Sequence, residues 1–176
     1  MMPFFKNLDE LSDITDITWN DRKRLGPLDK ASQNIMRGES SFTSAQKEVF
    51  AAFVSGLNAC SFCYGSHATV AENFGVPKNT IEALVEDIDS APVAENEKPL
   101  FEYLKKLTLS PSKLIHEDAN KVFHEGWGEK DLQDLILIGC LFNFYNRLLD
   151  GHGIKGNQAI YEFGAAHLHK NGYSVP

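Results

Sequence analysis

The segment over residues 129–150 constrains the fold more than any other part of the chain. It is bordered by two glycines on each side, and glycines mark the ends of helices. Within it, the run 135–142 (LILIGCLF) carries no charged side chain. A helix that is hydrophobic on nearly every face must be covered on all sides. The segment therefore predicts a long helix at the centre of the domain or in a contact between subunits.

From Thr43 onward, the rest of the chain also shows the capping residues and apolar spacing that are typical of helices. Thr43 and Gln46 are spaced as in a capping box, and apolar residues follow at helical spacing up to Leu57. Asn58 is the expected cap of a second helix over 59–74, and further helices are predicted over 80–88, 99–109, 115–125 and 157–170. No alternating run is long enough for a convincing strand. We expect an all-α fold.

The first forty residues differ from the remainder. The stretch 9–16 is acidic with weak periodicity, and Gly26-Pro27 is a turn signal. Only residues 31–37 suggest a short helix, which Gly38 would end. We expect an N-terminal arm and loop over 1–40 and a helical region over 41–176, which together form a single domain of ordinary size.

Composition excludes several classes of function. The chain has 24 acidic and 17 basic side chains, a formal charge of −7, which argues against a duplex nucleic-acid binder. Its longest apolar run of eight residues is too short to span a bilayer. The N-terminus lacks the apolar core of a secretory signal. We expect a cytoplasmic protein with neither a nucleic-acid nor a membrane partner.

Two of the three cysteines and one histidine form the pattern that carries chemistry. Cys60 and Cys63 are three residues apart and His67 follows four residues later, so all three share one face of the predicted helix. The positive end of the helix dipole lowers the pKa of a thiol in the first turns. In a chain without a disulfide framework, such a pair indicates redox or metal chemistry.

Glu48 is the candidate partner of this face. It precedes Cys60 by twelve residues, and its neighbours Ala51, Ala52 and Ser55 are small enough to let another helix approach closely. A carboxylate beside an imidazole raises its basicity and fixes its tautomer. We hypothesise that Glu48 lies against His67.

The stretch Glu48 … Cys60-Ser-Phe-Cys63-Tyr-Gly-Ser-His67 resembles the active-site motif of the AhpD-like alkylhydroperoxidase family, in the carboxymuconolactone decarboxylase superfamily. Residues 142–153 (FNFYNRLLDGHG) look like the second signature of its uncharacterised peroxidase-related branch. The resemblance implies an all-helical domain of antiparallel helix pairs with the Cys-x-x-Cys pair at a helix start. It also implies a homo-oligomer, since dimers, trimers and hexamers all occur in the superfamily.

The same resemblance implies a peroxidase that reduces organic hydroperoxides or hydrogen peroxide. Cys63 would attack, Cys60 would resolve the sulfenic acid as a Cys60–Cys63 disulfide, and Glu48 with His67 would relay protons. No cofactor is implied, and the partner would be an external thiol or lipoyl-type electron donor. Phe62 stands where the best-known members carry a histidine of their relay, which implies a relay that is shorter here or completed by water.

Two other interpretations of these residues stay open. One is a dithiol–disulfide adaptor that serves a separate peroxidase. The other is a non-catalytic, oligomeric metal-binding module, because Glu48, Cys60, Cys63 and His67 are all of types that bind zinc. A structural zinc site usually draws on a second cysteine or histidine pair, and the chain has no second Cys-x-x-Cys. We expect no metal.

The remaining candidates have simpler interpretations. Cys140 lies in the apolar helix and is expected in the core, whereas four histidines are expected at the surface or at helix ends: His116, His124, His167 and His169. His152 follows Gly151 in a turn and is expected to be structural. Asn143 and Arg147 share one face of the same helix, with Asp150 beyond them. Buried polar groups need partners, so this patch either fixes an interface or lines the active-site cavity. We favour the structural role.

Overall fold

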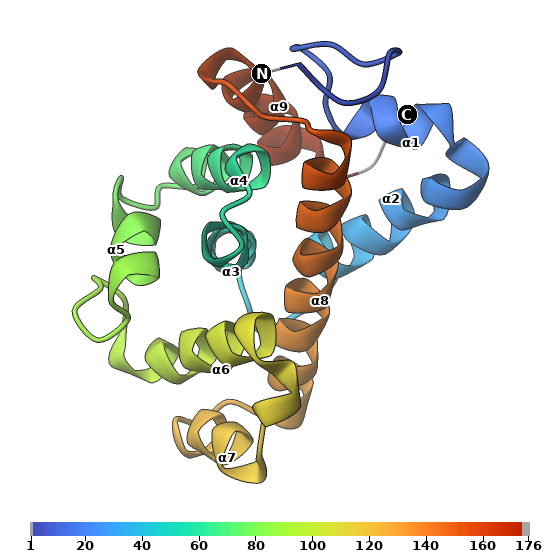
Figure 1. Ribbon diagram of the computed structural model, residues 1–176. Coiled ribbons are helices and arrows are strands. Elements are labelled where there is room, and N and C mark those ends of the chain that lie inside the picture. Colours follow the sequence, from blue (N-terminus) through green and yellow to red (C-terminus); the bar gives the residue numbers. More distant parts are fainter. Residues whose placement is uncertain (1, 174–176) are drawn as a thin grey trace.

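The computed structural model describes residues 2–173, and within them it contains helices and no strand (Figure 1). The all-α prediction is confirmed. The helices in chain order are α1 (Ile14–Asn20), α2 (Arg22–Arg37), α3 (Ser44–Leu57), α4 (Ser61–Asn73), α5 (Thr80–Glu86), η1 (Glu95–Glu97), α6 (Lys98–Leu109), η2 (Pro111–Lys113), α7 (His116–His124), α8 (Glu129–His152) and α9 (Gln158–Asn171). From α3 onward these bounds agree with the sequence-based helices to within a few residues.

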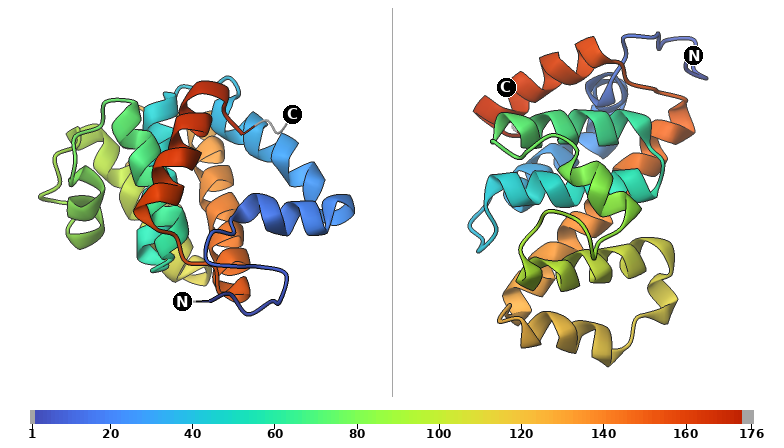
Figure 2. Two further views of the ribbon diagram at one scale, coloured as in Figure 1. Left: turned by 90° about the horizontal axis from the view of Figure 1, so that it is seen from above. Right: turned by 90° about the vertical axis from the view of Figure 1, so that its left-hand side faces the viewer.

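Helix α3 lies at the centre of the structure. It is seen almost end-on in Figure 1, with α4 and α6 on opposite sides and α8 crossing beside all three. Its capping box of Thr43 and Gln46 is present, and Phe50, Phe53 and Val54 are fully buried. Helix α9 lies along α4, on the side away from α3 (Figure 2). The core therefore surrounds α3 and is closed by α8.

Helix α8 is covered on one side only. Leu135, Ile138 and Phe142 are fully buried against α3 and α6, but Leu137 and Phe144 are 38% and 43% exposed. Cys140 lies on this outer face, so its predicted place in the core is wrong. Arg147 is exposed there too. In the part of the chain that the structure describes, no helix is long and apolar enough to cross a membrane.

The N-terminal region is more helical than its sequence suggests. The structure extends the short helix predicted over 31–37 back to Arg22 and adds α1 before it. Pro27 lies inside α2, where it removes one backbone hydrogen bond at a cost of about 3 kcal/mol. Leu28, Ile35 and Met36 pack against the core from the same helix. Tertiary packing therefore overrides the local turn signal.

A sharp turn joins α3 to α4. Asn58 ends α3 instead of capping α4, as the sequence had suggested, and Ala59 takes the left-handed conformation with φ of 55°. Cys60 follows as the N-cap of α4. The prediction that the Cys-x-x-Cys pair stands at a helix start is confirmed, and the turn aims both thiols at α8.

The position of Pro27 generates a test. We expect Pro27→Ala to raise the free energy of unfolding by about 1–2 kcal/mol, because it restores an N–H to the helix interior while loosening the unfolded chain slightly. Pro99→Ala is the matched control, since Pro99 stands at the first turn of α6, where no such bond is lost. Urea denaturation of both variants measures the difference. If both variants changed the free energy of unfolding equally, the backbone bond missing at Pro27 would not explain the effect.

Candidate active site

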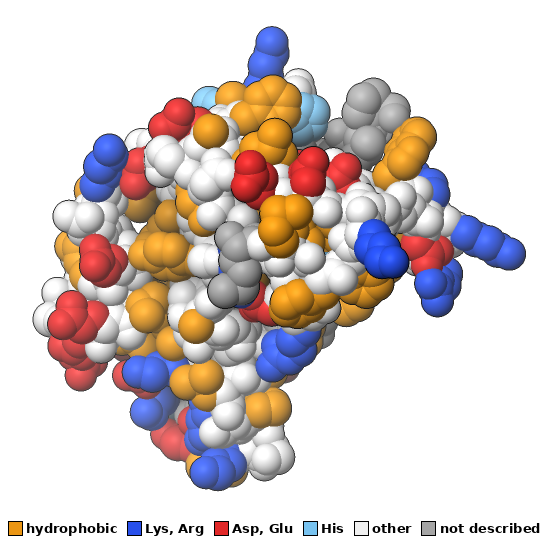
Figure 3. All heavy atoms as spheres, turned by 45° about the horizontal axis from the view of Figure 1, so that its top comes forward, with side chains coloured by type: hydrophobic (Ala, Val, Ile, Leu, Met, Phe, Trp, Pro, Cys, Tyr) orange, Lys and Arg blue, Asp and Glu red, His pale blue; other side chains and the backbone are white. Residues whose placement is uncertain are grey.

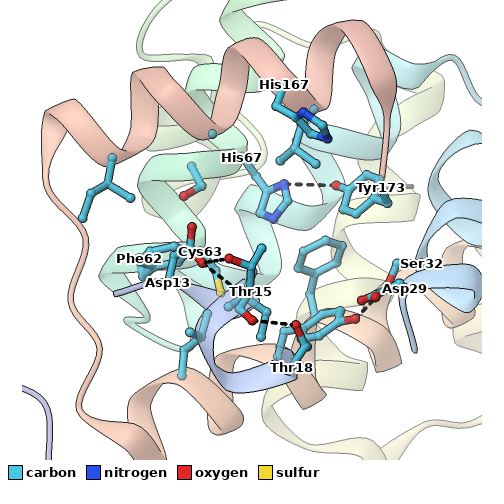
Figure 4. A pocket seen from close by; sticks show the side chains of 18 of the residues that line it. Asp13, Thr15, Thr18, Asp29, Ser32, Phe62, Cys63, His67, His167 and Tyr173 are labelled. Atoms are coloured by element: carbon cyan, nitrogen blue, oxygen red, sulfur yellow. Dashed lines mark hydrogen bonds between the residues drawn. The ribbon is translucent and has the colours of Figure 1, made fainter. Parts of the chain in front are cut away.

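Helix α4 presents its three reactive side chains to the interior. Cys60, Cys63 and His67 are 0%, 3% and 7% exposed, and both thiols are free. Cys63 and His67 line one cavity of about 340 Å³ between α1, α4, α8 and α9 (Figure 4). Cys60 does not line it. A small molecule in this cavity can therefore touch one thiol and the imidazole together.

Most of the cavity wall is apolar. Its hydrophobic side chains come from four helices and include Ile14, Phe62, Phe142, Leu149, Ile160 and Phe163. Polar groups enter mainly from α1 and α2, where Ser32 shares a 2.8 Å hydrogen bond with the hydroxyl of Tyr145. The first forty residues are thus part of the site.

Glu48 and His67 are in contact, as hypothesised from the sequence. The carboxylate of Glu48 is fully buried, and its Oε2 lies 2.6 Å from Nδ1 of His67. Because Nδ1 is engaged by the carboxylate, Nε2 is the ring nitrogen left for proton transfer. The small residues around Glu48 let α3 and α4 pack closely enough for this bond.

Arg37 also belongs to this group, although no sequence pattern points to it. Its Nη2 donates to Oε1 of Glu48 at 2.5 Å, and its guanidinium also donates to the carbonyls of Met36 and Leu168. Burial raises the pKa of Glu48, but His67 and Arg37 outweigh it and leave that pKa below its ordinary value. Glu48 is therefore held as a carboxylate.

Tyr173 completes the group from beyond the end of α9. Its hydroxyl lies 3.0 and 3.2 Å from the two carboxylate oxygens of Glu48 and 3.3 Å from Nδ1 of His67. Its ring stacks on that of His67 and lies under the guanidinium of Arg37. Burial, and then the charge of Glu48, hold the pKa of Tyr173 well above its ordinary value. The phenol therefore acts as a hydrogen-bond donor.

The two thiols are coupled to each other. A hydrogen bond from the thiol of Cys63 lowers the pKa of Cys60, whereas that bond and burial raise the pKa of Cys63 well above its ordinary value. Of the two sulfurs, Cys60 is therefore the more acidic and Cys63 is the one that holds its proton more tightly. Once Cys60 is ionised, the proton of Cys63 points to the base that can accept it.

Helix α8 supplies polar groups to the same pair. Asn146 is buried, accepts from Asn58 at 2.8 Å and donates to Ser55 at 2.9 Å, and its amide lowers the pKa of Cys63. The carboxylate of Asp150 raises the pKa of Cys60 and pairs with Lys155. The second signature therefore reaches the thiols through these two side chains.

The other candidates on α8 do not reach the cavity. Asn143 is half-buried, and Arg147 donates to its carbonyl and side-chain oxygens at 2.8 Å. Neither lines the cavity, and outside α8 the contacts of Asn143 are a bond from Asn58 and a bond to the hydroxyl of Thr108 on α6. Of the four histidines expected at the surface or helix ends, His167 is exposed but also lines the cavity mouth. Over residues 2–173, no three acidic, histidine or cysteine side chains converge as a metal-binding set.

The buried carboxylate generates one prediction. Glu48→Gln leaves Arg37 buried without its counter-charge, so we expect the free energy of unfolding to fall by about 3 kcal/mol. Glu102→Gln is the control, because Glu102 pairs with Lys121 at 3.4 Å on the surface, and its loss costs less than about 1 kcal/mol. Urea denaturation compares the two. If both variants lost the same free energy of unfolding, the buried pair of Glu48 and Arg37 would not stabilise the fold more than a surface pair does.

The phenol generates a second, pH-dependent prediction. The folded protein holds the proton of Tyr173 more tightly than the unfolded chain does, because the folded pKa is raised. The stabilisation is fully present below the unfolded pKa of about 10 and is lost as the pH rises through the folded pKa. We expect Tyr173→Phe to cost about 1–2 kcal/mol at neutral pH, and the difference from the wild type to shrink above pH ~10. A difference that stays constant over this range would contradict it.

The comparisons with known proteins bear on the fold. No protein-family model matches the chain. One relative in sequence is the uncharacterized protein YdfG of Bacillus subtilis (strain 168), 28% identical over 110 residues, which span 62% of this chain and 75% of YdfG.

Two solved structures are similar over nearly the whole chain. An uncharacterized peroxidase-related protein from Silicibacter sp. TM1040 superposes with a TM-score of 0.69 at 20% identity, covering 88% of this chain and 93% of its own. Another, described as the alkylhydroperoxidase AhpD core of a peroxidase-related protein from Ralstonia eutropha JMP134, gives 0.73 at 13% identity, covering 94% and 97%. The chain therefore has the fold of the AhpD-like, peroxidase-related proteins, as its resemblance to them in sequence predicts.

Proposed function

We propose that this protein is a thiol-dependent peroxidase that reduces hydroperoxides through Cys60 and Cys63. The observation that carries the proposal is the single cavity lined by both the Cys63 thiol and the His67 imidazole. A hydroperoxide needs a thiolate at its terminal oxygen and a proton donor at the oxygen that leaves. The cavity offers one residue for each task.

In the proposed reaction, the proton of Cys63 passes to the Cys60 thiolate, to which it is already hydrogen-bonded. The sulfur of Cys63 then attacks the terminal oxygen of the hydroperoxide, and the O–O bond breaks. Cys63 becomes a sulfenic acid, and the departing alkoxide takes the Nε2 proton of His67 in its imidazolium form and leaves as an alcohol. Sulfur loses two electrons and the peroxide gains them.

The second step consumes the sulfenic acid. Cys60 attacks the sulfur of Cys63, a disulfide forms between them, and the hydroxyl leaves as water. The sum is two thiols and one hydroperoxide converted to one disulfide, one alcohol and one water. An external dithiol, of the thiol or lipoyl type, is proposed to reduce the disulfide for the next turnover.

Glu48, Arg37 and Tyr173 act in this proposal as positioning residues for His67. The carboxylate fixes the ring through Nδ1, so that Nε2 carries the transferable proton, and Arg37 with Tyr173 holds the carboxylate in place. The chain has Phe62 in place of the additional histidine of the best-known relatives. Phe62 lies in the cavity wall, where it adds apolar surface instead of a proton donor.

The burial of both thiols favours a hydroperoxide over a protein disulfide as oxidant. With 0% and 3% exposure, neither sulfur is open to a partner protein, whereas the cavity admits a small molecule to Cys63. The apolar wall favours hydroperoxides with an organic group over hydrogen peroxide, because only the former can bury apolar surface there. The dithiol adaptor is kept as an outcome of the test.

The test is a titration of the reduced protein with one equivalent of cumene hydroperoxide, followed by alkylation and peptide mass spectrometry. We expect fast loss of two thiols as a Cys60–Cys63 disulfide. Cys60→Ser removes both the resolving thiol and the base for Cys63, so it should react more slowly and stop at a sulfenic acid on Cys63, which dimedone traps. Cys63→Ser should lose peroxide consumption altogether.

Cys140→Ser is the matched control, because Cys140 is the third cysteine and lies on the outer face of α8. It should consume peroxide as the wild type does. If Cys60 and Cys63 survive the peroxide but exchange rapidly with lipoamide disulfide, the adaptor replaces the peroxidase. Retained turnover in Cys63→Ser would also overturn the proposal.

A further inference from the structure

We propose that the cavity selects its substrate by charge: it accepts uncharged organic hydroperoxides, rejects those that carry a carboxylate, and uses Asp13 as the residue that discriminates. The inference rests on the proposed function and adds to it the chemical class of the organic group. It follows from which charged side chains line the cavity and which of them are neutralised.

The charged side chains in the cavity wall are acidic. Two carboxylates, Asp13 and Asp29, line it, and none of its described lining residues is a lysine or an arginine. Its two imidazoles are His67, which is engaged by Glu48, and His167 at the mouth. Figure 3 turns the end of the molecule with α1 and α9 forward, and acidic side chains there gather among apolar ones while most Lys and Arg lie toward the edges.

The two carboxylates differ in how far they are compensated. Asp29 forms an ion pair with Arg22, which lies about two turns earlier on the same face of α2. Among residues 2–173, no lysine or arginine pairs with Asp13, whose Oδ1 instead accepts from the backbone N and the hydroxyl of Thr15 at 2.7 and 2.6 Å. These two donors are neutral, so the negative charge of Asp13 persists at the cavity wall (Figure 4).

A second carboxylate nearby adds to this charge. Asp16 accepts from the backbone N of Asp13 at 2.9 Å and completes the capping box of α1. The box fixes both side chains at the start of a helix that forms one wall of the cavity. The local field is therefore negative and fixed, with apolar walls that screen it less than water does.

The consequence for a substrate can be estimated from Coulomb's law. A substrate carboxylate about 10 Å from Asp13 loses between about twofold and about fifteenfold in binding as the effective dielectric constant falls from about 80 to about 20. It also loses hydration without gaining a cationic partner from the wall. An uncharged alkyl or aryl group bears neither cost and buries its surface against Phe62, Phe142 and Phe163.

The experiment compares two hydroperoxides of matched shape, cumene hydroperoxide and its para-carboxylate analogue. The readout is the second-order rate of loss of the Cys60 and Cys63 thiols in a single turnover, so no electron donor is needed. At low ionic strength, we expect the carboxylate to react about fivefold to fifteenfold more slowly. Salt at about 0.5 M should narrow the gap.

Asp13→Asn tests the residue. Asparagine accepts the same cap hydrogen bonds as aspartate, so α1 keeps its N-terminus while the charge is removed. We expect the ratio of the carboxylate rate to the neutral rate to rise at least threefold, part of the Coulomb penalty. Asp89→Asn removes the same charge from an exposed position between α5 and α6 and should leave the ratio at its wild-type value.

The outcomes separate the inference from the function on which it rests. If both hydroperoxides oxidise the thiols at equal rates, charge selection is wrong and the peroxidase stands. If Asp13→Asn and Asp89→Asn change the ratio equally, the effect belongs to the net charge and Asp13 is not the discriminating residue. If neither compound oxidises the thiols, the proposed function itself fails.

Discussion

The buried carboxylate of Glu48 is the constraint on which the rest of the site depends. A charge without solvent contact must be paired, and one partner alone leaves oxygens of the carboxylate unsatisfied. Arg37 comes from α2, His67 from α4 and Tyr173 from beyond α9, so three distant segments meet at one side chain of α3. The region that the sequence suggests is an arm therefore belongs to the structural unit that fixes the imidazole.

Helix α8 joins the cavity wall to the thiols. Phe142, Tyr145 and Leu149 line the cavity, whereas Asn146 and Asp150 act on the pKa values of the two cysteines. Both sets recur three or four residues apart, so they occupy adjacent stripes of the same inner face. A shift of α8 would move the substrate wall and the thiol environment together, which couples the shape of the cavity to the reactivity of the pair.

The sequence predicted what depends on local pattern and missed what depends on tertiary packing. Capping residues and periodicity located α3 to α9, and the spacing of Cys60, Cys63 and His67 put them on one helix face. Pro27 carried a local turn signal that the packing of α2 overrides. Cys140 was expected in the core because the whole run is apolar, yet only one side of α8 is covered in the single chain.

The positioning residues could not have been found from spacing. Arg37 lies eleven residues before Glu48 across a loop, and Tyr173 lies 125 residues after it, so no helical period links either to the motif. In the sequence alone, any other arginine or tyrosine could equally be the partner of Glu48. Only the requirement that a buried carboxylate be fully paired selects these two, and that requirement becomes visible once the fold is known.

Charged groups deep in the site are paired, whereas a carboxylate at the cavity wall has no cationic partner among the described residues. The deep groups are paired: Glu48 bonds to Arg37 and His67, and Cys60 accepts the hydrogen bond from Cys63 that lowers its pKa. At the cavity wall, Asp13 is left without a cationic partner among the described residues. Between the two lies an apolar space where a neutral molecule pays no desolvation penalty for a charge. The chemistry is therefore placed where its own charges are stable and where those of a substrate would not be.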